Sequence, residues 1–324
     1  MQQHNNCLDK STINKVKEKI IQGNLISKEE ALNLVRLDTE ELCKAANEIR
    51  KHFCKNHFDL CGGKTGRMGN CSEDCKFCIQ SSHYNGQCKC HPMITYEDFK
   101  EDAIKQYEMG VNRFGIASAG KRITDKEVDL LCDSFKKLKK DCNIAICGYG
   151  GMLPYDKIVQ LKEAGVTRYH NNLETSRRFF KNICTTHTYD EKLKTLKYAK
   201  QAGLEICSGC ILGVGEKMSD RIELAFELKN LEVDSVPINI LTPRKGTPLE
   251  NADPLPYDEI LKTVAIFRFI LPKAEIRMAA GRILLEDGGK KCFESGANAT
   301  LIGDMITVKG ISPEKDIEMA ENFL

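Results

Sequence analysis

Apolar and polar positions alternate along the chain with two different periods, and the order of these patterns predicts the fold. In residues 1–55 apolar side chains recur at helical spacing, as at Ile13 and Ile20. Ser27 with Glu30 three residues later is typical of a capping box, which predicts the start of a helix. We therefore expect residues 1–55 to form a helical N-terminal cap on the domain that follows.

From residue 56 to residue 324, short strand-like apolar runs alternate with amphipathic stretches of helical period. Several of these stretches end in a glycine before the next run, as at Gly110, Gly165 and Gly203, which is typical of a helix C-terminus. Eight such alternations predict an α/β fold, a (β/α)8 TIM barrel, with a six-stranded partial barrel as the alternative. The expected strands lie around residues 57–61, 113–117, 144–147, 168–171, 205–208, 235–240, 275–278 and 300–302.

Composition and charge indicate which partners, which compartment and which cysteine chemistry to expect. The 324 residues are 41% hydrophobic and 29% charged, and the net charge of +2 does not favour nucleic acid or an anionic membrane as a partner. No apolar run approaches the ~20 residues of a membrane-spanning helix, and the polar start MQQHNNCLDK does not resemble a secretory signal. We expect a cytoplasmic protein. In a reducing compartment its sixteen cysteines indicate metal binding or redox chemistry rather than disulfides.

Three of these cysteines stand close together in a C-x3-C-x2-C motif, Cys71, Cys75 and Cys78, directly after a glycine-rich run. Structural zinc sites and cubane iron–sulfur clusters are usually closed by four ligands. A loop with three thiols therefore indicates a 4Fe–4S cluster with one iron open to another ligand. A structural zinc loop and a redox cysteine cluster are the alternatives.

Other polar residues are predicted at strand ends, where barrels of this kind carry their chemistry. Cys147 ends the third expected strand, Cys207 and Cys210 flank the end of the fifth, Asn239 ends the sixth and Arg277 the seventh. Several such residues that converge on one mouth of a barrel predict a site there.

The cysteine motif and the longer string CSEDCKFCIQSSHYN resemble the radical S-adenosylmethionine (SAM) superfamily, and in particular its biotin synthase branch. The resemblance extends over about residues 55–305. It is carried further by six downstream motifs: YHNNLETS, ICSGCILGVGE, VPINIL, KGTPL, IRMAAGR and ESGAN.

This resemblance implies a complete (β/α)8 barrel, a homodimer, and flavodoxin or ferredoxin as the electron donor. It implies that a 4Fe–4S cluster cleaves SAM to methionine and a 5′-deoxyadenosyl radical, which removes hydrogens from C9 and C6 of dethiobiotin. An auxiliary iron–sulfur cluster then supplies the sulfur that closes the thiophane ring.

The resemblance also assigns residues by position. The SAM cluster would be held by Cys71, Cys75 and Cys78, and dethiobiotin would contact Asn239. Five residues would contact SAM, through its ribose hydroxyls, its adenine or a close approach of the backbone: Asn172, Glu174, Phe77, Ile211 and Gly213.

One departure from the family concerns the auxiliary cluster. Cys147, Cys207 and Arg277 match three of its four usual ligands, but Gly115 stands where the family has a cysteine. Cys210 is an additional thiol where the family usually has glycine. We therefore hypothesise a differently built auxiliary cluster, of 2Fe–2S or 4Fe type, in which Arg277 donates hydrogen bonds to cluster sulfur instead of ligating iron. Its ligands would be Cys61, Cys147, Cys207 and Cys210.

The remaining cysteines and histidines have no assigned role in the proposed reaction. Cys88 and Cys90 with His91 form either a metal site or an exposed loop. Four cysteines are expected to pack in the core: Cys132, Cys142, Cys184 and Cys292. His170 and His187 are expected to be structural or hydrogen-bonding residues.

Two other functions remain as alternatives to biotin synthesis. The chain could be another radical SAM enzyme related to the hydrogenase-maturation proteins. It could also be a zinc- or iron-binding regulatory module without catalysis.

Overall fold

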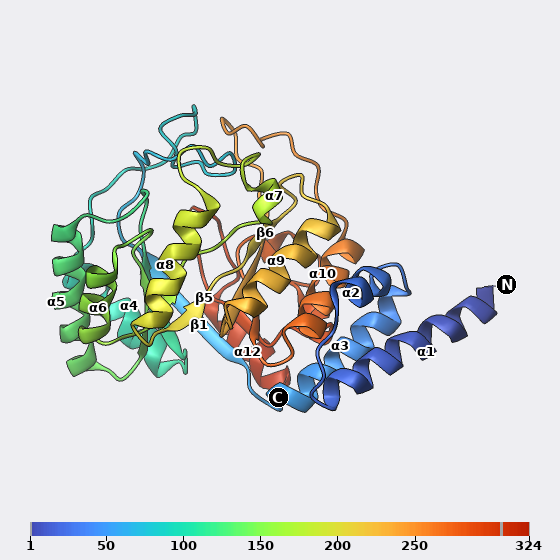
Figure 1. The fold of residues 1–324 in the computed structure, drawn as a ribbon. Coiled ribbons are helices and arrows are strands. Elements are labelled where there is room, and N and C mark those ends of the chain that lie inside the picture. The colour runs from blue at the N-terminus through green and yellow to red at the C-terminus, as the bar shows by residue number, and fades with distance from the viewer. Residues whose placement is uncertain (1, 305–306, 324) are drawn as a thin grey trace.

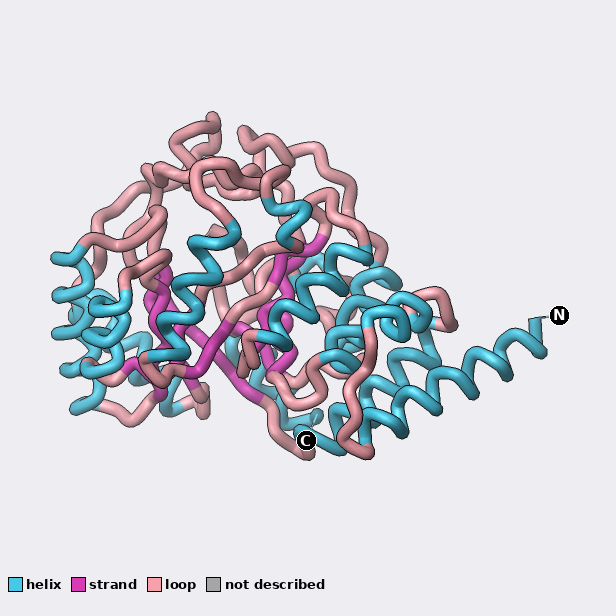
Figure 2. The backbone as a smooth tube through the Cα atoms, in the orientation of Figure 1, coloured by secondary structure: helices cyan, strands magenta, loops and turns pink. Residues whose placement is uncertain are grey.

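The computed structural model describes residues 2–304 and 307–323, with side chains from residue 9 onward. Its centre is a closed parallel barrel surrounded by helices (Figures 1 and 2). The predicted TIM barrel is confirmed, and the six-stranded alternative is excluded. The strands are β1 Asp59–Thr65, β2 Arg113–Ala117, β3 Ala145–Tyr149, β4 Val166–His170, β5 Glu205–Cys207, β6 Cys210–Leu212, β7 Ser235–Ile240, β8 Glu275–Met278 and β9 Ala299–Leu301.

The nine strands occupy eight positions around the barrel, which we call staves. The number is eight because β5 and β6 together form one stave, and both pair with β7. The ring closes where β1 pairs with β9. The fifth stave is interrupted at Gly209, which lies against β7: a Cβ atom at this position would lie 1.9 Å from the Pro237 carbonyl oxygen. Only glycine fits such a close approach of two backbones.

Helices cover the outside of the barrel, and capping boxes fix several of their starts. Thr124 begins α5, where its backbone N–H donates to Glu127 Oε2 at 2.7 Å, and Thr188 begins α8 with the same contact to Glu191. None of the described helices is long and apolar enough to cross a membrane. Their bounds are α4 Tyr96–Glu108, α5 Asp125–Asp141, α6 Tyr155–Glu163, α7 Arg177–Phe180, α8 Tyr189–Gln201, α9 Met218–Asn230, α10 Tyr257–Ile270, the 3₁₀ helix η1 Arg282–Leu284, α11 Lys290–Glu294 and α12 Pro313–Phe323.

Three helices precede the barrel: α1 Gln2–Ile21, α2 Lys28–Leu34 and α3 Thr39–Cys54. The capping box predicted at the start of α2 is present, with Glu30 N donating to Ser27 Oγ at 3.1 Å and Ser27 N donating to Glu30 Oε2 at 2.7 Å. Helix α3 packs on α10 and α11, and α2 packs on α9 and α10 (Figure 1). The helical cap is thus attached to one side of the barrel, and its boundary at residue 55 stays a prediction.

Charged side chains fill the barrel at the N-terminal ends of its strands. Arg168 donates to Glu275 at 2.6 Å and to Glu205 at 2.8 Å. Arg277 donates to the same Glu275 carboxylate at 2.8 Å and also pairs with Asp59. Arg168, Arg277 and Asp59 are each 3% exposed. Buried charges of this kind persist only when they are paired, so the network closes this end of the barrel with mutually neutralised groups.

Candidate active site

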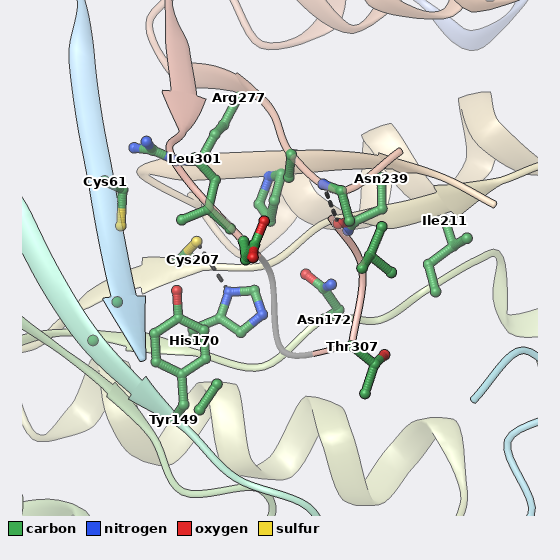
Figure 3. A pocket seen from close by; sticks show the side chains of 18 of the residues that line it. Cys61, Tyr149, His170, Asn172, Cys207, Ile211, Asn239, Arg277, Leu301 and Thr307 are labelled. Carbon is green, nitrogen blue, oxygen red and sulfur yellow. Dashed lines mark hydrogen bonds between the residues drawn. The ribbon is translucent and has the colours of Figure 1, made fainter. Parts of the chain in front are cut away.

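Above the charged network, a cavity of about 260 Å³ opens towards the C-terminal ends of the strands (Figure 3). Its position matches the face at which TIM barrels carry their chemistry. Most of the predicted site residues line it. These are Cys61, Cys147, Cys207 and Arg277 from the strands, and Phe77, Cys78, Asn172, Ile211 and Asn239 from strand ends and loops.

Three thiols from three staves face the cavity. Cys61, Cys147 and Cys207 come from β1, β3 and β5, and all three are buried. Burial raises the pKa of the Cys61 and Cys147 thiols, and it raises the pKa of Cys207 to about 11. At neutral pH they are therefore thiols, and metal binding here must release their protons. Sulfur donors without carboxylates are the chemistry that iron–sulfur clusters and other soft metals prefer.

An aromatic ring fills the place where the resemblance implies a fourth cysteine. Gly115 lies in register between Gly63 and Cys147. A Cβ atom on Gly115 would lie 2.4 Å from Cε2 of Tyr149, whose ring packs on His170 with centroids 4.5 Å apart. The absence of a side chain at Gly115 therefore leaves the space that the Tyr149 ring occupies, and β2 contributes no thiol to the cavity.

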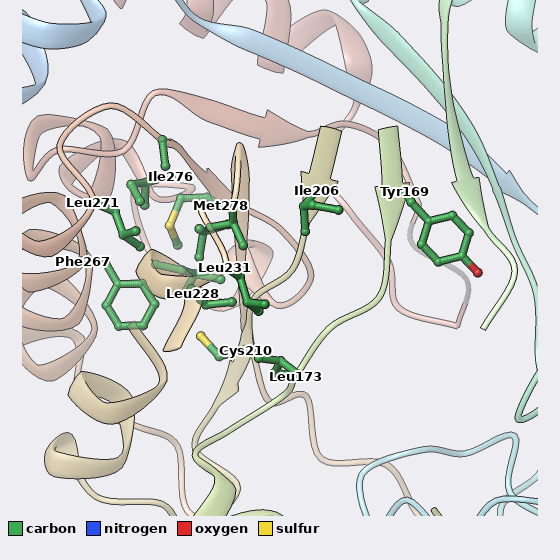
Figure 4. Packing of buried hydrophobic residues seen from close by; sticks show 14 of the residues in the cluster. Tyr169, Leu173, Ile206, Cys210, Leu228, Leu231, Phe267, Leu271, Ile276 and Met278 are labelled. Carbon is green, nitrogen blue, oxygen red and sulfur yellow. The ribbon is translucent and has the colours of Figure 1, made fainter. Parts of the chain in front are cut away.

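Cys210 does not join the other three thiols. Cys207 ends β5 and Cys210 begins β6, and neighbouring side chains on a strand face opposite sides, so Cys210 and Ile211 of β6 point in opposite directions. Ile211 lines the cavity, whereas the Cys210 thiol lies outside the barrel among apolar residues that include Leu173 and Leu228 (Figure 4). This placement gives no geometric support to the hypothesis that Cys210 is a cluster ligand.

Arg277 is held as a cation at the base of the cavity. It donates to the Thr300 carbonyl at 2.8 Å, in addition to its contacts with Asp59 and Glu275. Burial alone lowers the pKa of a guanidinium, but the nearby Asp59 and Glu275 carboxylates raise the pKa of Arg277 above its usual value. A protonated guanidinium donates hydrogen bonds and has no lone pair for a metal.

His170 contacts the same group of thiols. Its Nδ1 atom lies 3.2 Å from Cys207 Sγ (Figure 3). Burial, with Lys192 and Arg277 nearby, lowers the pKa of His170 to about 3, so the imidazole is neutral. The predicted hydrogen-bonding role of His170 is confirmed, and its partner is a cavity thiol.

The three-cysteine loop lies at the mouth of the cavity. Cys71 N donates to Gln80 O and Cys78 N donates to Cys75 O, both at 2.9 Å, which gives the loop a fixed backbone. Cys78 reaches the cavity and Cys71 is buried, whereas the Cys75 thiol points to Cys184, with the two Sγ atoms 3.8 Å apart. The loop therefore places the motif at the mouth of the cavity, with the Cys75 thiol directed towards Cys184 instead of the cavity.

Glu174 provides a clear indication of a missing partner. Its Oε2 atom is buried and has no hydrogen-bond partner among the described residues. Lys192 Nζ is 4.0 Å from Oε1, and burial raises the pKa of this carboxyl group. An unpaired buried acceptor is rare in folded proteins. Ribose hydroxyls are suitable donors for it, so the residues present fit a bound SAM molecule.

The other predicted contacts are placed as follows. Asn239 lines the cavity and its amide is fixed at both ends, since Nδ2 donates to Cys210 O at 3.0 Å and Oδ1 accepts from Ala280 N at 3.1 Å. Gly213 and Glu174 are not among the cavity-lining residues. Gly213 has a φ of +91°, and its N–H donates to the buried Glu216 carboxylate at 3.1 Å. This carboxylate holds the glycine turn in shape.

Two features of the site escaped sequence analysis. Tyr149 lies two positions after Cys147 on the same strand face, and this spacing is a signal that could have placed it in the cavity. Cys184, expected in the core, is buried but also contacts His187, whose side chain is in reach of Cys75 as well. Its C-x2-H spacing was the available signal.

The loop thiols Cys88 and Cys90 show no metal-binding arrangement. Cys90 is exposed, and His91 Nδ1 lies 2.9 Å from Pro92 O. Among the described residues, the His, Cys, Asp and Glu groups close enough to share an ion are Cys75 with Cys184 and His187, and His57 with Asp59 and Glu275. The exposed-loop interpretation fits this region better.

Comparisons with known proteins agree with this architecture. Residues 67–228 match the Radical SAM superfamily, and residues 237–323 match the Biotin and Thiamin Synthesis associated domain. Among solved structures, methylornithine synthase has a TM-score of 0.77 at 21% identity, and covers 88% of this chain and 85% of its own. The FeFe-hydrogenase maturase HydG from Carboxydothermus hydrogenoformans has a TM-score of 0.80 at 17% identity, with 99% of this chain and 83% of its own covered. These two similarities concern the fold.

Sequence relatives are much closer. The biotin synthase of Clostridium botulinum strain Langeland is 50% identical over 313 residues, which cover 97% of this chain and 98% of the relative. The biotin synthase of Akkermansia muciniphila is 48% identical, with 93% and 94% covered. With half of its residues shared over almost its entire length, the chain belongs to the biotin synthase family of radical SAM enzymes.

Proposed function

We propose that this enzyme inserts sulfur between C6 and C9 of dethiobiotin, the reaction expected of a biotin synthase. The observation that carries the proposal is one cavity whose lining includes thiols from two separate sets, Cys78 of the loop motif and Cys61, Cys147 and Cys207 of the strands. One set lies on the loop at the mouth and the other lies deep among the strands, next to the charged base. Such an arrangement suits a reaction that generates a radical at one end and delivers sulfur from the other.

At the mouth, we propose that Cys71, Cys75 and Cys78 hold the 4Fe–4S cluster and that SAM binds beside them. The bound cluster and SAM together supply the 5′-deoxyadenosyl radical. Glu174 accepts a hydrogen bond from a ribose hydroxyl of SAM, and Asn172 helps to orient the ribose. Phe77 and Ile211, which line the cavity near Cys78, provide apolar surface for the adenine. The enclosing barrel keeps water and other reactive groups away from the substrate.

Deep in the cavity, we propose that Cys61, Cys147 and Cys207 ligate the auxiliary iron–sulfur cluster, with the Arg277 cation beside it as a counter-charge. The five N–H groups of Arg277 already donate within the protein, to Ser235, Asp59, Thr300 and Glu275, so its effect on a negatively charged cluster is that of a nearby positive charge. Cys210 is omitted from this set because it faces the outer core. Asn239 is proposed to orient the ureido ring, since its amide is already held in place by two backbone contacts.

Iron and sulfide counts on anaerobically reconstituted protein test this ligand set. Cys61→Ala, Cys147→Ala and Cys207→Ala should each lose auxiliary iron while the SAM cluster remains. Cys210→Ala and the buried control Cys132→Ala should retain all iron. Loss of iron in Cys210→Ala, or retention in Cys61→Ala, would contradict the proposed set.

A homodimer and an external electron donor complete the proposal. Flavodoxin or ferredoxin is proposed to reduce the SAM cluster, whose loop lies at the mouth where an electron can enter. Light scattering of the purified protein tests the dimer. Replacement of dithionite by each reduced donor protein in the activity assay tests the donor.

The activity assay combines the protein with SAM, dithionite and dethiobiotin under anaerobic conditions. We expect biotin together with two molecules of 5′-deoxyadenosine per biotin, because each radical removes one hydrogen. Dethiobiotin deuterated at C6 and C9 should transfer deuterium to the deoxyadenosine. Deoxyadenosine without biotin would instead indicate a different radical SAM reaction, and the absence of both would indicate a metal-binding protein without this catalysis.

A further inference from the structure

A compact group of three metal-binding side chains lies behind the cysteine loop. Cys184 Sγ is 3.8 Å from Cys75 Sγ, 3.3 Å from His187 Nδ1 and 3.7 Å from His187 Nε2. Cys184 and His187 are buried, and Cys75 is half-buried. One ligand atom from each residue lies within 4.8 Å of the others. Neither Cys184 nor His187 has a part in the proposed reaction.

The spacing matches that of a tetrahedral metal site. Zinc binds thiolate sulfur at about 2.3 Å and imidazole nitrogen at about 2.0–2.1 Å. In a tetrahedron these bonds place two sulfurs ~3.8 Å apart and a sulfur and a nitrogen ~3.6 Å apart. The 3.8 Å between the two sulfurs agrees with the first value, and the 3.7 Å from Cys184 Sγ to His187 Nε2 agrees with the second, while His187 Nδ1 lies nearer to Cys184, at 3.3 Å.

The histidine is already oriented for metal binding. Glu73 Oε2 lies 2.5 Å from His187 Nδ1, and both side chains are buried. A carboxylate that accepts the Nδ1 proton leaves the Nε2 lone pair free, which is the usual arrangement behind a metal-bound histidine. This contact favours the tautomer with its proton on Nδ1 and holds the ring in position.

The charge around the group favours a cation. Besides Glu73, the Asp74 carboxylate lies 3.2 Å from Cys184 Sγ and accepts from the backbone N–H groups of Thr185 at 2.8 Å and Thr186 at 3.1 Å. Two carboxylates next to two thiols attract a dication, and the positive charge of the bound ion drives the release of the two thiol protons that its binding requires.

We propose that Cys75, Cys184 and His187 form a binding site for a thiophilic divalent metal ion such as Zn²⁺, and that the ion bound there competes with the SAM cluster for Cys75. The three side chains supply three ligands, and water completes the tetrahedron. Two thiol protons leave as the ion binds, and no electron is transferred. The metal site rests on geometry alone, whereas the competition rests on the proposed role of Cys75 as a cluster ligand.

Cobalt titration of the full-length, cluster-free protein under anaerobic conditions tests the site. We expect one tightly bound Co²⁺ with thiolate charge-transfer absorption, displaced by Zn²⁺. Cys184→Ala should lose about half of that absorption and at least tenfold in affinity, and His187→Gln should lose affinity but keep the absorption. The control Cys132→Ala, whose thiol contacts Gln160 O elsewhere in the fold, should behave as the unaltered chain.

An unchanged cobalt spectrum and affinity in Cys184→Ala would overturn the site, because it would mean that Cys71, Cys75 and Cys78 hold the ion. X-ray absorption of the unaltered protein loaded with Zn²⁺ gives an answer that needs no variant. Two sulfur and one or more nitrogen or oxygen neighbours support the proposal, and three sulfur neighbours contradict it.

Cluster assembly tests the competition. Zn²⁺ added before iron and sulfide should slow assembly of the SAM cluster in the unaltered chain and have little effect in Cys184→Ala. Equal inhibition of both proteins would overturn the competition. If neither protein assembles a SAM cluster without Zn²⁺, the proposed function fails, while the cobalt result still decides the metal site.

Discussion

Substitution of Glu174 by Gln should weaken SAM binding without unfolding the barrel. The carboxylate is buried, Oε2 has no partner among the described residues, and the nearest cation, Lys192, is 4.0 Å away. In the proposed complex this oxygen accepts from a ribose hydroxyl. The substitution replaces one carboxylate oxygen with an NH₂ group, which cannot accept that hydrogen bond and removes the negative charge.

The expected loss follows from the strength of hydrogen bonds to charged groups. Such a bond contributes about 1.5–3 kcal/mol, which corresponds to a roughly 10- to 150-fold higher Kd for SAM. Glu174→Asp is the conservative control. The residue has a φ of +69°, a left-handed conformation that Asp tolerates well. We expect this variant to keep most of the affinity.

The pH dependence gives a second measurement. Burial raises the pKa of Glu174, and the hydroxyls of SAM donate to its ionised form. SAM affinity should therefore be highest above this raised pKa and fall as the pH decreases through it. Glu174→Gln has no group to titrate at this position, so its affinity should lack that decrease.

Equilibrium binding of SAM to the anaerobically reconstituted protein measures all of these effects. An analogue of SAM without the ribose hydroxyls separates the mechanism from general damage, because it should bind the unaltered chain and Glu174→Gln with similar affinity. If Glu174→Gln binds SAM as tightly as the unaltered chain, or loses affinity equally for the analogue, the assignment of Glu174 to the ribose is refuted.

Three further predictions concern the interior of the barrel. Arg277→Leu leaves Asp59 buried without its counter-charge and should lower the free energy of unfolding by about 3–5 kcal/mol; denaturation of the cluster-free chain measures this, and a loss of under ~1 kcal/mol would contradict the buried pair. Gly115→Ala places a methyl group 2.4 Å from the Tyr149 ring and should destabilise the fold by about 1–3 kcal/mol. Thermal unfolding of this variant and of its combination with Tyr149→Leu checks the cause, since equal losses in both backgrounds would exclude the ring. Cys210→Ala should lower stability by roughly 1–2 kcal/mol through a lost core side chain while the iron content is unchanged, so a stable variant that lacks iron would reverse its assignment.

Much of the fold could be predicted from the sequence because each barrel stave is a local pattern. Strands β2, β7 and β8 have the predicted bounds, and the eight alternations correspond to the eight staves. The expected first strand, residues 57–61, began two positions before the observed β1 and ended at Cys61 instead of Thr65, and it ended early because the glycines that continue β1 have no apolar signal.

The deep site was predictable in part. Cys147, Cys207 and Arg277 reach the cavity because each occupies the predicted place on its strand. Cys210 was grouped with them by its proximity to Cys207 in sequence, although Cys210 directly precedes Ile211 of β6, and neighbouring side chains on a strand point in opposite directions. The alternation rule could have separated them.

The contact between Cys75 and Cys184 could not be predicted from local pattern. The two residues are separated by 109 positions. They meet because the cysteine loop docks on the segment before α8, where Lys76 N donates to Ile183 O at 2.9 Å. Neither sequence neighbourhood carries a signal for this docking.

The charged base of the barrel imposes an order of events. Arg168, Arg277 and their carboxylate partners fill the end of the barrel beneath Cys61. The cavity formed by the described strands is therefore closed at this end and open only at the C-terminal ends of the strands. Whatever lies deepest must enter first and leave last. In the proposed arrangement the sulfur source is installed before dethiobiotin arrives, and SAM enters last. The products of each SAM cleavage can then leave while the reaction intermediate stays bound beneath them. Two successive hydrogen abstractions can therefore occur on one substrate molecule before it is released.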